Sequence, residues 1–97
     1  MTNKVKLMET GGVNPRFLDA EINESGDLVF SGQDMGPIVE QIFGDSDYEY
    51  WLTIRSKDKD SVLLALLEIF FKEHKIPFNE FRELLESKGI PSEFTSY

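Results

Sequence analysis

Alternation of apolar and polar side chains is clearest at residues 17–23, where Leu18, Ala20 and Ile22 are separated by polar residues. A period of two places these three side chains on one side of an extended chain, which is typical of a half-buried strand. The sequence ESGD follows, and DLVFS at 27–31 has the composition of another strand. Two such runs joined through a Ser-Gly step predict a β-hairpin.

Weaker alternation at residues 4–9 predicts an earlier strand, with Val5 and Leu7 on one side and Met8 with two lysines on the other. Between the two strands, the sequence TGGVNPR has paired glycines and an Asn-Pro step, which indicate a turn. Residues 32–36, with the sequence GQDMG, are interpreted as a loop.

A short helix is predicted after this loop. Pro37 suits the first turn of a helix, and Gly44 suits its end. The apolar residues between them have the spacing of a buried stripe: Ile38, Val39, Ile42 and Phe43. Alternation then resumes at 48–54, which predicts a strand with Leu52 on one side and Trp51 on the other.

Two further helices complete the predicted fold. Nine of the ten residues at 62–71 are apolar, so this long helix must be covered on more than one side. A narrower apolar stripe from Phe78 to Leu85 predicts a last helix that ends at Gly89. The order β-β-β-α-β-α-α predicts a single α+β domain over residues 1–97. In it, a small antiparallel sheet of about four strands packs on the long helix, and the C-terminal helix covers that helix from its other side.

Composition excludes several kinds of chemistry. The chain has no cysteine and one histidine, His74, so disulfides, thiolate metal sites and cysteine nucleophiles are absent and a zinc site is not expected. Its beginning lacks the apolar segment of a secretory signal, and its longest apolar run is far shorter than the roughly 20 residues needed to cross a bilayer. We therefore expect a cytoplasmic protein.

Charge is distributed very unevenly along the chain. The net charge is −8, and residues 17–54 alone carry nine acids and no base. Such a field repels nucleic acid and anionic lipid, and it accelerates the encounter with a basic protein. We expect these acids to gather on one side of the molecule and to bind a basic protein partner; the plainer interpretation is that they keep the protein soluble.

Catalysis and metal binding have weak support in the sequence. Asp45, Asp47 and Glu49 have the spacing of the first ligands of an EF-hand, but Tyr50 replaces the required glycine and Ser56 the required glutamate. No nucleophile with an oriented base and no phosphate-binding loop can be recognised. We expect no enzyme, no cofactor and no metal. The alternative is a small-molecule binder or a small enzyme that uses the Gln33/Asp34 loop and Glu49.

Trp51 is the best candidate for an anchor of protein binding. It shares a predicted strand face with Glu49, and an exposed tryptophan with an acidic rim is typical of an interaction hot spot. The predicted partner-binding residues are Asp34, Asp45, Asp47, Glu49 and Trp51. Two alternatives stay open: Trp51 packs against the C-terminal tail, or it supports self-association. The oligomeric state is also left open.

Two segments, SGQDMGPIVEQIFGDSDYEYWLTI and KGIPSEFTSY, resemble a group of short bacterial proteins of uncharacterised activity. The shared features are a GQDxGP segment, an acidic turn into a YE strand, a leucine-rich helix and a GIPxEFxSY tail. The resemblance implies matching positions but no activity; they are Gln33, Asp34, Gly36, Tyr48, Glu49, Glu93, Phe94 and Tyr97. Small acidic proteins of this kind are similar to immunity proteins that block a toxin, which suggests an immunity-type inhibitor of a basic toxin by analogy.

Overall fold

The computed structural model describes residues 3–96, and the predicted Tyr97 position lies outside this range. The chain is an α+β protein with the element order β-β-β-α-β-α-α, as predicted. It divides into two compact units at the Asp60–Ser61 bond, and each unit is described by itself. The packing of the long helix on the sheet, and the single domain that it implies, stay predictions.

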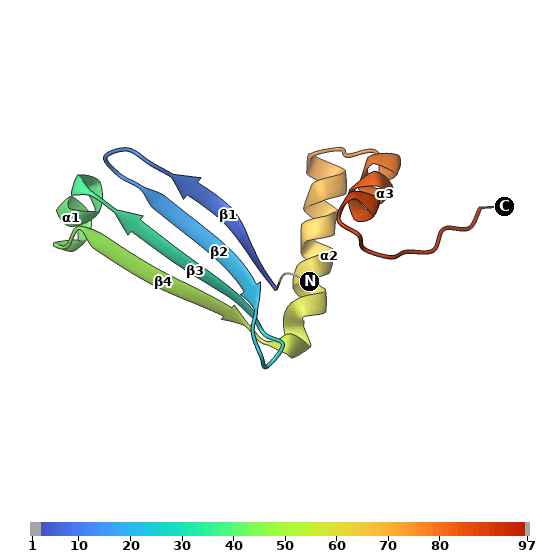
Figure 1. Cartoon of the computed structure of the whole chain (residues 1–97), viewed down its shortest axis with the longest axis horizontal. Helices are drawn as coiled ribbons and strands as arrows, with labels where there is room; N and C mark the ends of the chain where they lie inside the picture. The colour runs from blue at the N-terminus through green and yellow to red at the C-terminus, as the bar shows by residue number, and fades with distance from the viewer. Residues whose placement is uncertain (1–2, 97) are drawn as a thin grey trace. The chain divides into compact units, whose positions relative to one another are not determined.

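The first unit is built around a four-stranded antiparallel sheet in which each strand pairs with the next one along the chain (Figure 1). Short turns connect the first three strands, and residues 36–46, which include a short helix, connect the third strand to the fourth. The strands are β1 (Lys4–Thr10), β2 (Arg16–Ile22), β3 (Leu28–Met35) and β4 (Asp47–Ile54).

The hairpin between β2 and β3 is confirmed, and its turn is held by one side chain. The Asn23 carboxamide oxygen accepts hydrogen bonds from the backbone amides of Ser25 at 3.0 Å and Asp27 at 2.9 Å. Gly26 has a φ of 81°, a conformation that residues with a Cβ rarely adopt. The turn chemistry in the sequence therefore fixes the register of both strands.

Strand β3 is longer than predicted, because residues 32–35 extend it where the sequence suggested a loop. Gly32 lies opposite Leu18 of β2 and Tyr50 of β4. The Tyr50 ring occupies the space that a Cβ on Gly32 would need. An aromatic side chain on the neighbouring strand thus covers the glycine and lets the strand continue.

Strand β1 contains a bulge that changes which residues share a face. Lys6 lies opposite Asp19 while Met8 lies opposite Leu18, so Leu7 is the extra residue. Beyond the bulge, Met8 lies on the face of Leu18, the opposite side from Lys6. The prediction that Met8 shares a side with the lysines was therefore wrong.

Helix α1 (Pro37–Phe43) follows β3 and was predicted correctly, with proline in its first turn and Gly44 in the left-handed conformation at its end. The side chain of Asn14, from the β1–β2 turn, accepts a hydrogen bond from the Ile38 amide at 3.1 Å. This contact satisfies one of the free amides at the start of the helix. Of the predicted buried stripe, only Val39 is buried; Ile38, Ile42 and Phe43 are exposed.

The C-terminal part of the chain is helical. A 3-10 turn at Ser56–Asp58 leads into α2 (Lys59–Glu68), which continues as a π-helical turn at Ile69–Glu73. Helix α3 (Phe78–Ser87) ends where predicted: Gly89 has a φ of 68°, and the Ile90 amide donates to the Leu85 carbonyl at 2.9 Å. This is the pattern of a Schellman cap.

Four aromatic rings join the helices of this second unit. Neighbouring ring centroids lie 5.3–6.4 Å apart, mostly in edge-on or tilted arrangements. The rings belong to Phe70, Phe71, Phe78 and Phe81. Within residues 3–96, no helix combines the length and the apolar character that a membrane crossing requires.

Candidate functional site

The register of the sheet gives its two faces different chemistry. Directly opposed residues in neighbouring strands point to the same side, and successive residues along one strand point to opposite sides. The apolar face carries Val5, Met8, Leu18, Ala20, Ile22, Leu28, Phe30, Tyr50, Leu52 and Ile54. The other face, called here the acidic face, carries Phe17, Asp19, Gln33, Asp47, Glu49 and Trp51, with Lys4 and Lys6 at its β1 edge.

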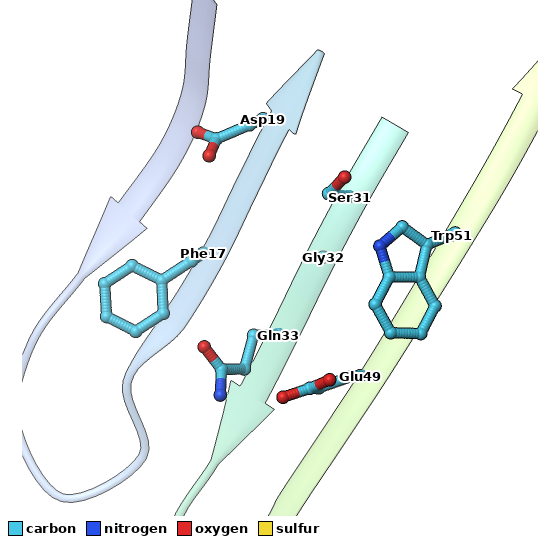
Figure 2. Close-up of a pocket in the computed structure, with 7 residues that line it drawn as sticks. All are labelled: Phe17, Asp19, Ser31, Gly32, Gln33, Glu49 and Trp51. Carbon is cyan, nitrogen blue, oxygen red and sulfur yellow. The ribbon is translucent and has the colours of Figure 1, made fainter. Parts of the chain in front are cut away.

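A shallow pocket of about 250 Å³ lies over the middle of the acidic face (Figure 2). Two rows of opposed residues line it, each running from β2 across β3 to β4. One row is Phe17, Gln33 and Glu49, and the other is Asp19, Ser31 and Trp51.

One row has its aromatic residue on β2 and its carboxylate on β4, and the other row has them the other way round. The two aromatic residues therefore lie at diagonally opposite corners of the pocket, and so do the two carboxylates. The Phe17 and Trp51 rings occupy one diagonal, on either side of β3 (Figure 2). The Asp19 and Glu49 carboxylates occupy the other diagonal. Only Ser31 and Gln33 lie between the four corners, so the centre stays open.

The aromatic corners of the pocket are accessible. Trp51 is 65% exposed, and Phe17 is half-buried against the sheet. An exposed tryptophan offers a flat apolar surface together with an indole N–H donor. Within the second unit, the Arg82 guanidinium lies 3.7 Å from the centre of the Phe94 ring.

The carboxylates around the pocket differ in their partners. Asp19 lies 3.8 Å from the Lys4 ammonium, and both groups are solvent-accessible, so this ion pair contributes little stability. Asp47 accepts a hydrogen bond from the Gln33 carboxamide at 3.0 Å. Within the part of the chain that the structure describes, no ion pair links Glu49 to a base. Glu49 is thus available to a cationic ligand.

Three of the five predicted partner-binding residues, Asp47, Glu49 and Trp51, lie together on the acidic face. Asp34 does not, because it lies on the opposite side of β3, where the Arg16 guanidinium pairs with it at 3.1 Å. Asp45 lies in the exposed turn after α1 and does not line the pocket.

The residues of the alternative small-molecule site, Gln33, Asp34 and Glu49, also lie on two different faces of the sheet. Gln33 and Asp34 belong to a strand and not to a loop, so they point to opposite faces. Gln33 lines the pocket beside Glu49, while Asp34 lines a second hollow with Arg16 and residues of α1.

The expectation that all acids of residues 17–54 gather on one side was wrong. Four of the nine lie on one face of the sheet: Asp19, Glu21, Asp47 and Glu49. Three of the nine are paired with bases from outside this segment, in the ion pairs Lys4–Asp19, Arg16–Asp34 and Arg55–Asp27. The remaining acids lie in turns or on α1.

Asp27 has a structural role. It is 7% exposed, and its carboxylate accepts hydrogen bonds from the Ser56 amide at 2.8 Å and the Arg55 guanidinium at 3.1 Å. The Ser56 amide lowers the pKa of Asp27 below its ordinary value of 3.8, and Arg55 adds to this effect while burial opposes it. These contacts tie the β2–β3 turn to the end of β4.

Phe17 is the pocket residue that sequence reasoning missed. The sequence places Phe17 on the same side of its strand as Asp19. Its position across the pocket from Trp51 depends on the register between β2 and β3 and on the register between β3 and β4. Within residues 3–96, no group of three histidine, aspartate or glutamate side chains is arranged to hold a metal ion. Comparison with protein-family models, with curated proteins and with solved structures gave no match.

Proposed function

We propose that this protein is a non-catalytic interaction module whose acidic face binds a basic protein. One observation supports the proposal above all: the pocket holds two aromatic rings on one diagonal and two carboxylates on the other. This arrangement suits the side chain of lysine or arginine, whose carbon stem is apolar and whose end is cationic.

The physical basis is complementary charge next to aromatic surface. A cation over an indole ring gains roughly 0.5–2 kcal/mol, with the larger value where water is excluded. Carboxylates at the adjacent corners add charge-assisted hydrogen bonds to the same group. The tryptophan thus anchors the contact, and the acids select a basic partner over an acidic one.

The charge of the whole chain supports rapid association. With a net charge of −8, the protein attracts a basic partner over long distances, and salt screens this attraction. An immunity-type inhibitor of a basic toxin is one biological role that uses such a face, because the acids imitate the phosphates of a nucleic acid.

A small-molecule binder or enzyme built on Gln33, Asp34 and Glu49 is less well supported. Asp34 lies on the other face of the sheet and is paired with Arg16. The two remaining residues line a pocket that is open to solvent, whereas small-molecule sites usually enclose most of their ligand.

The proposal can be tested with a blocked peptide of alternating arginine and valine. Trp51 is the only tryptophan in the chain, so its fluorescence reports directly on this face. We expect the peptide to change the fluorescence, and its affinity to fall at least about tenfold when the salt concentration rises from about 20 to 200 mM. Absence of binding, or binding insensitive to salt, would contradict the proposal.

A matched pair of double variants separates the acidic face from net charge. Asp19→Asn with Glu49→Gln removes two charges from the pocket, and Glu83→Gln with Glu86→Gln removes two charges from α3. We expect the first pair to weaken peptide binding by about tenfold or more and the second by less than about threefold. Equal losses would show that the peptide senses only the total charge.

A further inference from the structure

We propose that the basic partner binds as an added β-strand along the free edge of β4, so that its alternate side chains reach the acidic face. This inference rests on the proposed function and specifies how the partner is held. Its basis is a difference between the two outer strands of the sheet, β1 and β4. An outer strand has unpaired backbone amides and carbonyls along its free side, which can pair with another chain.

Strand β1 is protected against such pairing. The bulge at Leu7 interrupts its regular backbone pattern, and Lys4 and Lys6 place positive charges on it. Bulges and lysines are the devices by which proteins prevent pairing at a sheet edge, and the lysines also repel a basic segment.

Strand β4 has none of these protections. All eight of its residues, from Asp47 to Ile54, pair with β3 in a regular register, so its backbone is unbroken. Its sequence, DYEYWLTI, contains no lysine, arginine, proline or glycine. Tyrosine, tryptophan, threonine and isoleucine all favour extended structure. The edge is therefore long and regular enough to pair with another strand.

The side chains along β4 describe the segment that fits beside it. Asp47, Glu49 and Trp51 follow one another on the acidic face at every second position, about 7 Å apart. Tyr50 and Leu52 alternate with them on the apolar face. Cross-strand neighbours of opposite charge or shared apolar character stabilise a pair of strands. The best partner is thus a segment in which basic residues alternate with β-branched or other apolar residues.

A second copy of this chain fits the same edge less well. It would bring another net charge of −8, together with its own Asp47 and Glu49, to a strand that already carries both acids. A basic segment brings complementary charge instead, so the charge distribution favours it as the occupant.

The test uses backbone methylation of the alternating arginine-valine peptide. In a strand, the amides of every second residue point to one edge and those of the remaining residues to the other. One peptide carries N-methyl groups on all arginines, and a second carries them on all valines. Both keep the charges of the parent, but each loses hydrogen bonding along one edge only.

We expect the added strand to run antiparallel to β4, as neighbouring strands of the sheet do, and this direction predicts an unequal result. One methylated peptide should bind within about threefold of the parent, because its methyl groups point away from β4, and the other should bind at least about tenfold more weakly. Equal affinities, or equal losses for both, would overturn the strand pairing. The proposed function would survive that result, and it fails separately if the parent peptide does not bind at all.

Sedimentation of the protein alone tests whether a second copy of the chain occupies the β4 edge. We expect a monomer over the concentration range of the binding measurements, because like charges oppose pairing of two copies. A dimer that the parent peptide dissociates would identify a second copy at the β4 edge. That outcome would overturn the inference that the edge is free for a basic partner.

Discussion

The two faces of the sheet are made by the same strands yet have opposite chemistry. On β4, Glu49 and Trp51 belong to the acidic face, while Tyr50 and Leu52, their immediate neighbours, belong to the apolar face. The apolar face contains Ala20, which with Val39 forms the set of buried apolar residues within residues 3–96, and the covered Gly32. The acidic face carries the open pocket. Adjacent residues can therefore have entirely different roles.

We therefore expect stability and the proposed binding to depend on different faces of the sheet. Residues of the apolar face pack on one another across the strands, so changing them should alter the free energy of unfolding. Residues of the acidic face are solvent-accessible, so changing them should alter binding and leave stability nearly constant.

Gly32→Val should produce the largest loss of stability. A side chain at this position overlaps the end of the Tyr50 ring, so the ring must turn away and lose its packing over β3. We expect the free energy of unfolding to fall by about 1–3 kcal/mol in urea denaturation, as for other overpacked sites. The control is Ser31→Ala, one residue away on the acidic face, which should change stability by less than about 0.5 kcal/mol. Equal effects would remove the distinction between the faces.

Trp51→Ala should produce the largest loss of binding. It removes the exposed ring of the pocket, and we expect the arginine-valine peptide to bind at least about tenfold more weakly by titration calorimetry. The matched control is Thr53→Ala, on the same face of β4 but outside the pocket, which should bind within about threefold of the original protein. A large loss of stability in Trp51→Ala would show that the ring belongs to a core.

Asp27→Asn should reduce stability in a pH-dependent way. The pKa of Asp27 is lowered in the folded protein, so its carboxylate stabilises the fold above the unfolded value and loses this effect as pH falls through 3.8 toward the folded value. The variant should therefore be less stable at neutral pH, and its deficit should shrink in acid. Denaturation with urea from pH 7 to pH 3 measures this.

The control for this series is Asp45→Asn, which removes an exposed carboxylate from the turn after α1. Its free energy of unfolding at neutral pH should stay within about 0.5 kcal/mol of that of the original protein, because an exposed turn acid contributes little to folding. A constant deficit for Asp27→Asn would mean that its hydrogen bonds matter independently of charge.

Asp34→Asn should have the smallest effect of all. It breaks an exposed ion pair with Arg16, which contributes about 1 kcal/mol or less. It lies on the face opposite to the pocket, so peptide binding should be unchanged, whereas Glu49→Gln, with the same change in charge, should weaken it. Equal weakening by both variants would contradict the assignment of recognition to one face.

Much of the fold could be predicted, because local patterns determine it. Alternation located the strands, and the Ser-Gly step identified the β2–β3 hairpin. Helix α1 was bounded by Pro37 and Gly44, whose backbone preferences do not depend on distant contacts.

Features that depend on distant contacts could not be predicted in the same way. Gly32 looked like a loop residue because its cover, the Tyr50 ring, comes from a strand that lies much later in the chain. The bulge in β1 changes the phase of alternation at Leu7, and a short, weakly alternating strand does not reveal it.

The sequence predicted only the part of the site that lies on a single strand, β4. Glu49 and Trp51 share a face by alternation alone, and the sequence showed this directly. Phe17 joins them only through the combined register of three strands. Asp34 was misplaced because its segment was interpreted as a loop, which has no faces to distinguish.

The order of strands in the sheet, β1-β2-β3-β4, has a consequence for synthesis on the ribosome. Every strand finds its partner immediately before or after it in the chain, so closing the sheet requires few long loops and low contact order favours rapid formation. Because α2 follows β4 in the chain, Ile54 leaves the ribosome before the leucine-rich helix does. The backbone of the nascent sheet can therefore become hydrogen-bonded while the most apolar segment is still inside the ribosome.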